Sequence, residues 1–156
     1  MRILFVCSGN TCRSPLAEAI ARSVAAERGL DDIEVASAGT SAWDGATASD
    51  GSMLVAIERG YDLDAHRART LTADLVGWAD LVLAMGPQHR ERAIALGGAG
   101  KSYLLTDYAS RGATARAVND PFGGDLAGYR TTADELETEI RKVLDRVASE
   151  QAGGRP

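Results

Sequence analysis

Apolar residues along this chain form two patterns, short continuous runs and longer stretches with a repeat close to four. The continuous runs predict four buried strands, at residues 2–6, 33–36, 79–85 and 102–105. The longer stretches predict helices, marked by Leu16, Ile20 and Val24, by Leu54 and Ile57 before Gly60, and by Leu136, Ile140, Val143, Leu144 and Val147. Strands alternate with helices, which favours a small parallel α/β sheet with helices on both faces.

Polar stretches set the expected boundaries between these elements. Pro87 is expected to begin a short polar helix that ends at residues 97–98, and residues 106–131 are expected to form a long loop. Thr132 and Glu135 have the spacing of a capping box, which predicts the start of the terminal helix. We expect one domain over residues 1–149 and a frayed tail over 150–156.

Composition narrows the function classes. The chain has 156 residues, a formal net charge of −5 and 45% hydrophobic residues, so a nucleic-acid-binding surface is not expected. No apolar run is long enough for a membrane span or a signal-peptide core. The two cysteines, Cys7 and Cys12, do not form a disulfide scaffold. We therefore expect a monomeric protein of the cytoplasm, which is a reducing compartment, and we expect no membrane or nucleic-acid partner.

The loop after the first predicted strand carries the strongest chemical signal. Residues 7–14 read Cys-Ser-Gly-Asn-Thr-Cys-Arg-Ser, and Pro15 suits the first turn of the following helix. Five residues between Cys7 and Arg13 allow successive backbone N–H groups to surround one tetrahedral oxyanion, assisted by the helix dipole. Arg13 can donate two hydrogen bonds to such an anion, and the same positive field stabilises Cys7 as a nucleophilic thiolate.

Other interpretations of these residues are weaker. The nucleotide-binding pattern with Gly-Lys-Ser/Thr is absent, which disfavours a kinase or GTPase. A metal site is not expected, because only His66 and His89 remain as soft ligands and they lie far apart in the sequence. Both cysteines can also be small buried hydrophobic residues of a strand–helix turn, an alternative that is stronger for Cys12 than for Cys7.

Residues 5–15 closely resemble the active-site motif of the low-molecular-weight protein tyrosine phosphatase family. Further matching segments follow in order at residues 37–39, 66–69, 79–83 and 120–123, so the resemblance spans about residues 2–148. It implies a three-layer fold with a four-stranded parallel sheet in the flavodoxin-like order 2-1-3-4. It also implies hydrolysis of phosphorylated protein side chains through a phosphocysteine, without cofactor or metal.

The resemblance also implies roles for single residues. Cys7 is the expected nucleophile and Arg13 the phosphate ligand, within a phosphate-binding loop of Ser8, Gly9, Asn10, Thr11, Cys12, Arg13 and Ser14. Asp120, one of 22 acidic residues, carries no signal alone, but in Asp-Pro-Phe-Gly it matches the general acid of the family. Ser14 is expected to hydrogen-bond Cys7, while Asn10 and Ser37 brace the loop.

Substrate choice depends on the residue between Asn10 and Cys12. Typical tyrosine-specific members have a bulky aliphatic residue there, whereas Thr11 and the Asp-Pro-Phe-Gly-Gly segment resemble the bacterial protein arginine phosphatase branch. A threonine hydroxyl can accept a hydrogen bond from a guanidinium. Phosphoarginine is therefore slightly favoured, with phosphotyrosine as the alternative. Phe122 and Trp43 are candidate walls of the substrate cleft, although Trp43 can also be a loop anchor.

Two expectations concern the cysteines and two concern the histidines. An arsenate reductase that relays a disulfide needs a further cysteine downstream, and none follows Cys12; a single-cysteine reductase stays open. Cys12 can form a reversible disulfide with Cys7 under oxidation. His66 is expected to make a structural hydrogen bond, and His89, on a polar helix, is expected to face solvent.

Overall fold

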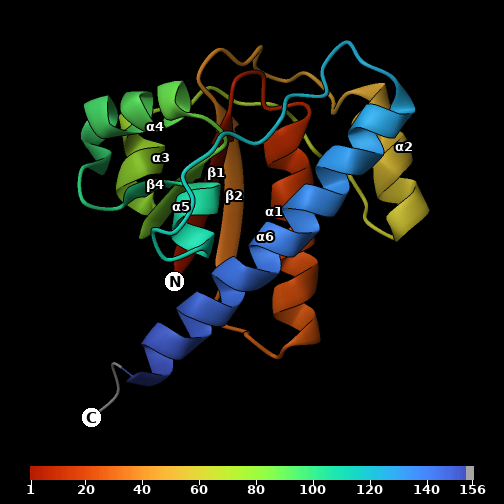
Figure 1. Cartoon of the computed structure of the whole chain (residues 1–156). Helices are drawn as coiled ribbons and strands as arrows, with labels where there is room; N and C mark the ends of the chain where they lie inside the picture. Colours follow the sequence, from red (N-terminus) through yellow and green to blue (C-terminus); the bar gives the residue numbers. More distant parts are fainter. Residues whose placement is uncertain (154–156) are drawn as a thin grey trace.

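In the computed structural model, which describes residues 1–153, one parallel sheet lies between two helical layers (Figure 1). The strands are β1 (Arg2–Cys7), β2 (Glu34–Gly39), β3 (Leu81–Ala84) and β4 (Ser102–Leu104). All neighbouring strands pair in parallel in the order β2-β1-β3-β4. The expected sheet and its order are therefore confirmed, with strand ends shifted by one to three residues.

Helices that connect the strands, together with two helices that follow the last strand, cover both faces of the sheet. They are α1 (Arg13–Glu27), α2 (Asp50–Arg59), α3 (Ala73–Trp78), α4 (Pro87–Ala93) with the wide turn η1 (Ile94–Gly98), α5 (Leu105–Ala109) and α6 (Leu126–Gly153). On one face, Ile3 and Phe5 pack against α1 and α6. On the other, Leu4 and Val6 pack against α3 and α4. Burial on both faces explains why the strands read as continuous apolar runs.

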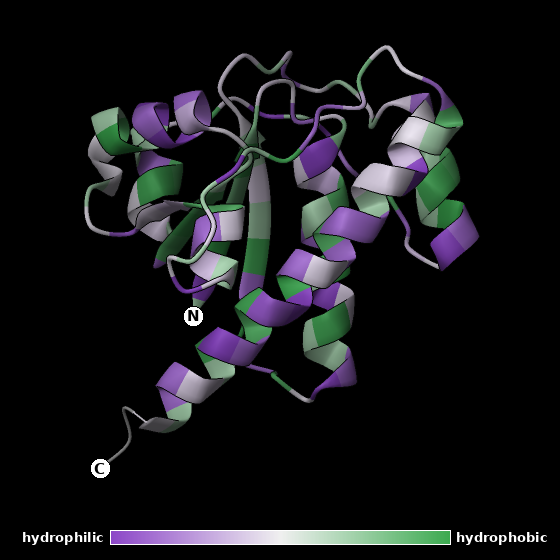
Figure 2. Ribbon diagram, in the orientation of Figure 1, coloured by the Kyte–Doolittle hydropathy of each residue, from purple (hydrophilic) through white to green (hydrophobic). Residues whose placement is uncertain are grey.

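Hydropathy follows this layering. Figure 2 shows hydrophobic colours over much of the strands, whereas hydrophilic and hydrophobic segments alternate along α6. Ile140, Val143 and Leu144 of α6 are completely buried against the sheet layer. No helix within residues 1–153 combines the length and apolarity needed to cross a bilayer.

The region expected to be a long loop differs from the prediction. It contains the single-turn helix α5, and α6 begins at Leu126 rather than near Thr132. Thr132 and Glu135 therefore lie inside the helix, and the capping-box interpretation is wrong. Leu126, Tyr129 and Ala133 explain the earlier start, because they pack with Cys12 and Val55 in a separate small cluster.

The C-terminal end also differs from expectation. Helix α6 continues through residues 150–153, part of the stretch expected to be frayed. The remainder of that stretch, residues 154–156, lies outside the described residues. The N-terminal boundary of α3 was not predicted; Thr72 provides it, since its hydroxyl accepts a hydrogen bond from the Leu75 N–H at 3.2 Å.

Candidate active site

The loop that joins β1 to α1 lies at the carboxyl edge of the sheet, at the top of Figure 1. Cys7 is the last residue of β1 and Arg13 the first of α1, so the strand and the helix fix both ends of the loop. Backbone N–H groups of Thr40 and Ser41 donate to the Cys7 and Ser8 carbonyls at 3.0 and 2.9 Å. These bonds hold the loop against the segment after β2, and a loop fixed in this way can present successive N–H groups to an anion.

Gly39, at the end of β2, allows this close approach. A Cβ atom at Gly39 would lie 2.5 Å from the Ser8 carbonyl oxygen and 2.9 Å from the Asn10 nitrogen. Any other residue would therefore push the loop away from the sheet. This is the physical reason for a glycine at residue 39 within the segment 37–39.

The Cys7 sulfur is buried and has two polar neighbours. The Ser14 hydroxyl oxygen lies 2.9 Å from the sulfur, and the Asn10 backbone N–H donates to it at 3.3 Å. Both contacts bring a hydrogen-bonding group to the sulfur from the loop and from the first turn of α1. Cys7 is only 2% exposed, so reagents reach it only through the pocket described below.

Asn10 determines the direction of these hydrogen bonds. Its side-chain oxygen accepts from the Arg69 backbone N–H at 3.0 Å, which leaves its NH₂ group to donate to the Ser14 and Ser37 hydroxyls at 2.8 and 3.0 Å. Because Ser14 accepts from Asn10, its single proton is available to donate to the Cys7 sulfur.

The network around Asn10 is completed on two sides. The Ser37 hydroxyl donates to the Glu18 carboxylate at 2.9 Å, and the His66 ring donates to the Asn10 carbonyl at 2.7 Å. Asn10 itself is completely buried with φ of 55°, a left-handed conformation that asparagine tolerates better than most residues. Asn10, Ser37 and His66 thus lie where a brace for the loop requires them.

Arg13 directs a buried positive charge toward the same loop. It is 5% exposed, and its Nη1 donates to the Val118 carbonyl at 3.0 Å. Its Nε is buried without a hydrogen-bond partner within residues 1–153. An unsatisfied buried donor on a guanidinium is costly, and an oxyanion in the loop would satisfy it. Arg13 Nε is therefore available as a donor to an anionic ligand.

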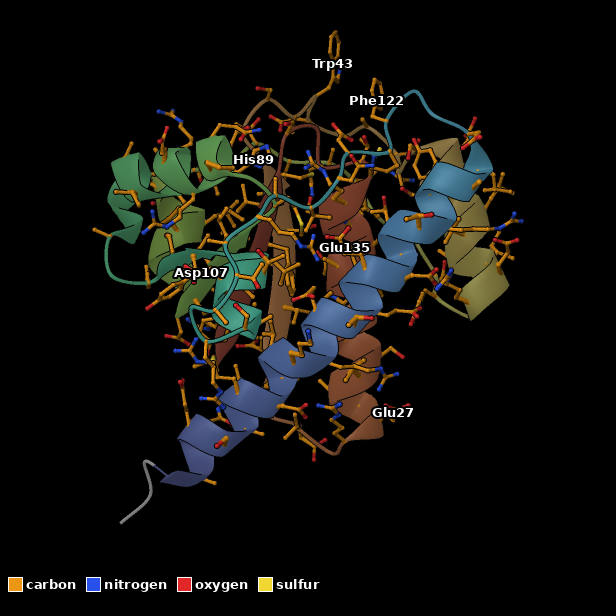
Figure 3. The ribbon with its side chains drawn as sticks, viewed as in Figure 1. Glu27, Trp43, His89, Asp107, Phe122 and Glu135 are labelled. Atoms are coloured by element: carbon orange, nitrogen blue, oxygen red, sulfur yellow. The ribbon has the colours of Figure 1, made fainter. Side chains whose placement is uncertain are left out.

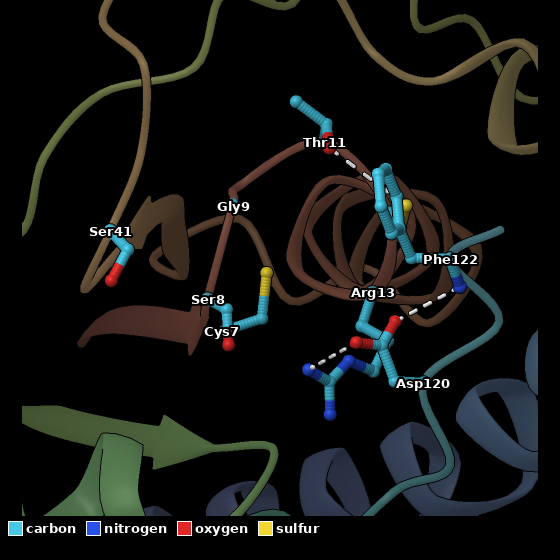
Figure 4. Close-up of a pocket in the computed structure, with 9 residues that line it drawn as sticks. Cys7, Ser8, Gly9, Thr11, Arg13, Ser41, Asp120 and Phe122 are labelled. Carbon is cyan, nitrogen blue, oxygen red and sulfur yellow. Dashed lines mark hydrogen bonds and ion pairs between the residues drawn. The ribbon is translucent and has the colours of Figure 1, made fainter.

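Asp120 approaches this position from the segment between α5 and α6. Its Oδ2 lies 3.5 Å from Arg13 Nη2, and its Oδ1 accepts from the Phe122 backbone N–H at 3.0 Å (Figure 4). Val118 attaches the segment to the sheet, because its N–H donates to the Met85 carbonyl at 2.8 Å. The carboxyl group is about half exposed, at 51%, so it is able to exchange protons with solvent.

A pocket of about 230 Å³ brings most of the sequence-predicted residues together. Figure 4 shows it, and its lining residues are Cys7, Ser8, Gly9, Thr11, Cys12, Arg13, Ser41, Asp120 and Phe122. Trp43 is not among them. It is 84% exposed and projects outward from the loop after β2, beyond Phe122, which is 71% exposed (Figure 3). Trp43 therefore neither lines this pocket nor anchors its loop by burial.

Cys12 lines the pocket and also contacts two hydroxyl groups. Its sulfur contacts the Ser49 hydroxyl at 3.2 Å and the Tyr129 hydroxyl at 3.6 Å. Burial raises the pKa of Tyr129, and the neighbouring sulfur adds to this effect. Both cysteines are free thiols, so the expected disulfide stays a prediction.

The expectation that His89 faces solvent is wrong. His89 is 0% exposed, and its Nε2 lies 2.8 Å from the Ser8 hydroxyl oxygen. It lies in the first turn of α4, on the side that packs over β1 and β3 (Figure 3). The sequence did not indicate this inward position because most residues of Pro87–Ala93 are polar. The only signal was Ala93, an apolar residue four positions later on the same helix face, which is also buried.

Comparisons with known proteins converge on one family. A family model described as low molecular weight phosphotyrosine protein phosphatase matches residues 2–152. A protein-arginine-phosphatase of Geobacillus stearothermophilus is 38% identical over 152 residues, covering 96% of this chain and 98% of the relative. The low molecular weight protein-tyrosine-phosphatase PtpB of Staphylococcus haemolyticus is 36% identical over 144 residues, covering 92% and 97%.

A solved structure agrees in fold as well as sequence. The YwlE arginine phosphatase, as a C7S mutant with a phosphorylated active-site serine, superposes with a TM-score of 0.87 at 38% identity. The superposition covers 95% of this chain and 96% of that one.

Proposed function

This chain belongs to the low molecular weight phosphotyrosine protein phosphatase family, and from that premise we propose which of its residues carry the reaction. It is a cysteine-dependent protein phosphatase. The observation that supports the residue roles is the buried pair of complementary groups in one loop. Cys7 Sγ accepts hydrogen bonds from the Ser14 hydroxyl and the Asn10 backbone N–H, and Arg13 Nε has no hydrogen-bond partner within residues 1–153.

In the first step, the Cys7 thiolate attacks the phosphorus atom of the bound side chain. The new S–P bond forms as the bond from phosphorus to the leaving oxygen or nitrogen breaks. Arg13 and the loop N–H groups bind the three equatorial oxygens, whose charge they neutralise. Asp120, in its protonated form, gives its proton to the leaving atom, which departs with the electron pair of the broken bond.

In the second step, water attacks the phosphocysteine. The Asp120 carboxylate takes a proton from that water, the S–P bond breaks, and the electron pair returns to Cys7. The Ser14 hydroxyl donates to the sulfur as its charge reappears. Inorganic phosphate leaves, and Asp120 is again protonated for the next cycle. The solved relative with a phosphorylated serine in its C7S mutant supports a covalent intermediate at this position.

For the substrate, we propose that phosphoarginine is favoured over phosphotyrosine. Thr11 lines the pocket, and among the described residues its hydroxyl makes only a long 3.8 Å contact with the Cys12 sulfur. The hydroxyl oxygen is therefore available to a substrate N–H. A guanidinium has several such donors, and a phenol ring has none on its carbon edge. The related Geobacillus enzyme named as an arginine phosphatase supports this choice. The PtpB relative keeps phosphotyrosine as the second candidate.

The experiment is a direct comparison of kcat/KM on matched phosphoarginine and phosphotyrosine peptides. We expect the higher value for phosphoarginine. Thr11→Ile should lower the phosphoarginine-to-phosphotyrosine ratio about tenfold, because it removes one hydrogen-bond acceptor and enlarges the apolar wall. Thr114→Ile, at an exposed position outside the pocket, is the matched control. A wild-type preference for phosphotyrosine that Thr11→Ile leaves unchanged would favour the second candidate.

The setting of the reaction follows from the nucleophile. We propose a reducing compartment, the cytoplasm, since Cys7 must remain a free thiol to act. Phosphorylated proteins are the proposed partners. A monomeric state and the absence of a cofactor stay predictions.

A further inference from the structure

One buried side chain next to the pocket has no role in the mechanism above. His89 of α4 lies behind Ser8, the residue that follows Cys7 in the loop. The two residues are 81 positions apart in the sequence, yet Ser8 Oγ and His89 Nε2 are separated by 2.8 Å. Ser8 lines the pocket, whereas His89 is completely buried behind it. A hydrogen bond therefore joins a buried histidine to a side chain that lines the pocket.

The ring nitrogens of His89 have unequal surroundings. Nδ1 is buried and has no hydrogen-bond partner within the described residues, while Nε2 faces the Ser8 hydroxyl. Burial and the nearby Arg13 charge lower the pKa of His89 to about 4, and Asp120 opposes this only in part. The imidazole is thus neutral at physiological pH and carries one N–H.

The position of that single proton sets the direction of the hydrogen bond. A proton on Nδ1 would bury a donor with no acceptor, which costs about 1–3 kcal/mol in proteins. A proton on Nε2 donates to Ser8 and leaves only a bare lone pair on Nδ1. Ser8 Oγ therefore accepts from His89. The bond to His89 is the only one made by Ser8 Oγ within residues 1–153, so the serine proton is free to point into the pocket.

We propose that His89 is a positioning residue that holds the Ser8 hydroxyl as a hydrogen-bond donor to the phosphoryl group of the substrate. The inference rests on the proposed function, because it requires a phosphoryl group in the pocket. It adds one side-chain donor to the backbone N–H groups and Arg13 of the loop. Its competitor is a purely structural role, in which His89 only fills space between α4 and the sheet.

A thermodynamic cycle separates these two roles. The four proteins are the wild type, Ser8→Ala, His89→Phe and the double variant, and the probe is inorganic phosphate titrated by calorimetry. Each single variant should weaken phosphate binding about tenfold, equal to ~1.4 kcal/mol. The double variant should be no weaker than either single variant, because His89 acts through Ser8. His89→Gln, which keeps an N–H donor, should recover most of the affinity.

Controls keep the cycle interpretable. Urea unfolding measures the stability of every variant, and Val82→Ala supplies a buried deletion on the same side of the sheet that leaves Ser8 and His89 in place. Val82→Ala should be less stable and bind phosphate with unchanged affinity. If His89→Phe does not fold, the comparison of Ser8→Ala with Ser8→Thr tests the donor directly, and only Ser8→Thr should retain wild-type affinity.

Two results would overturn the inference. One is additive losses in the double variant, and the other is unchanged phosphate affinity in Ser8→Ala. The same proteins are assayed on phosphorylated peptides, so the two claims can fail separately. A wild type that hydrolyses the peptides while the cycle is additive defeats this inference alone. A wild type that neither binds phosphate nor hydrolyses the peptides defeats the proposed function and this inference together.

Discussion

Acid should destabilise this protein through His89. An ordinary histidine has a pKa of 6.5, whereas burial and Arg13 lower that of His89 to about 4. Between these two values the unfolded chain binds a proton at residue 89 and the folded chain does not. Stability therefore rises with pH in this window. The contribution of His89 is fully present above pH 6.5 and is lost as the pH falls toward 4.

The magnitude follows from the size of the pKa change. One pKa unit corresponds to about 1.36 kcal/mol, so the contribution amounts to about 3 kcal/mol over the whole window and about 2 kcal/mol between pH 7.5 and pH 5. Other groups also titrate in this range. The test is therefore the difference between the wild type and His89→Phe, which has no titratable group at that position.

Urea unfolding at pH 7.5 and pH 5 measures this difference. For a urea dependence of about 2 kcal/mol per molar, the wild-type midpoint should fall by about 1 M more than the midpoint of His89→Phe. Asp120 and Arg13 are the charged groups near the ring, and both remain in the variant. Parallel declines in the two proteins would refute the burial of a neutral imidazole at residue 89.

Two further predictions concern the pocket. Asp120→Asn should lower kcat on phosphotyrosine peptides at least 100-fold, because a general acid usually contributes about that much to the rate. Calorimetry should show phosphate affinity changed by less than about threefold. An unchanged kcat would remove Asp120 from the mechanism. Cys12→Ser should make inactivation by peroxide irreversible, because Cys7 would lose its disulfide partner. The measurement is the activity that dithiothreitol restores after peroxide treatment. Equal recovery in the wild type and in Cys12→Ser would exclude that disulfide.

The sequence predicted the sheet well because its strands are buried on both sides. Side chains of a strand point alternately to its two faces, so a continuous apolar run such as residues 2–6 indicates a strand covered on both faces. The strand order, by contrast, came from the family resemblance. The loop residues from Cys7 to Ser14 could be recognised because an oxyanion loop needs a fixed spacing between the sulfur and the guanidinium.

The errors lie where tertiary contacts override local patterns. Thr132 and Glu135 have the spacing of a helix start, yet Leu126 and Tyr129 gain enough burial to extend α6 by nearly two turns before them. Helix α5 is too short to form alone and depends on its buried Leu105 and Tyr108. No pattern of a single sequence identifies such contacts in advance.

His89 and Trp43 show the same limit for the candidate site. A histidine among Gln, Arg and Glu resembles a solvent-facing residue, and only the three-dimensional position of Ser8 reveals its partner. Trp43 is an aromatic residue near the right loop, but the chain after β2 carries it outward instead of over the pocket. Large exposed side chains on loops are placed by backbone geometry that hydrophobic periodicity does not encode.

The central claim is that Cys7 carries the phosphoryl group during turnover, and rapid-quench peptide mapping tests it most directly. The protein is mixed with an excess of phosphorylated peptide, quenched within the first turnover, digested and analysed by mass spectrometry. We predict one phosphoryl group on the peptide that contains Cys7, formed together with a burst of dephosphorylated product and absent from Cys7→Ala. Turnover with no phosphoryl group at Cys7, or full turnover by Cys7→Ala, would contradict the account.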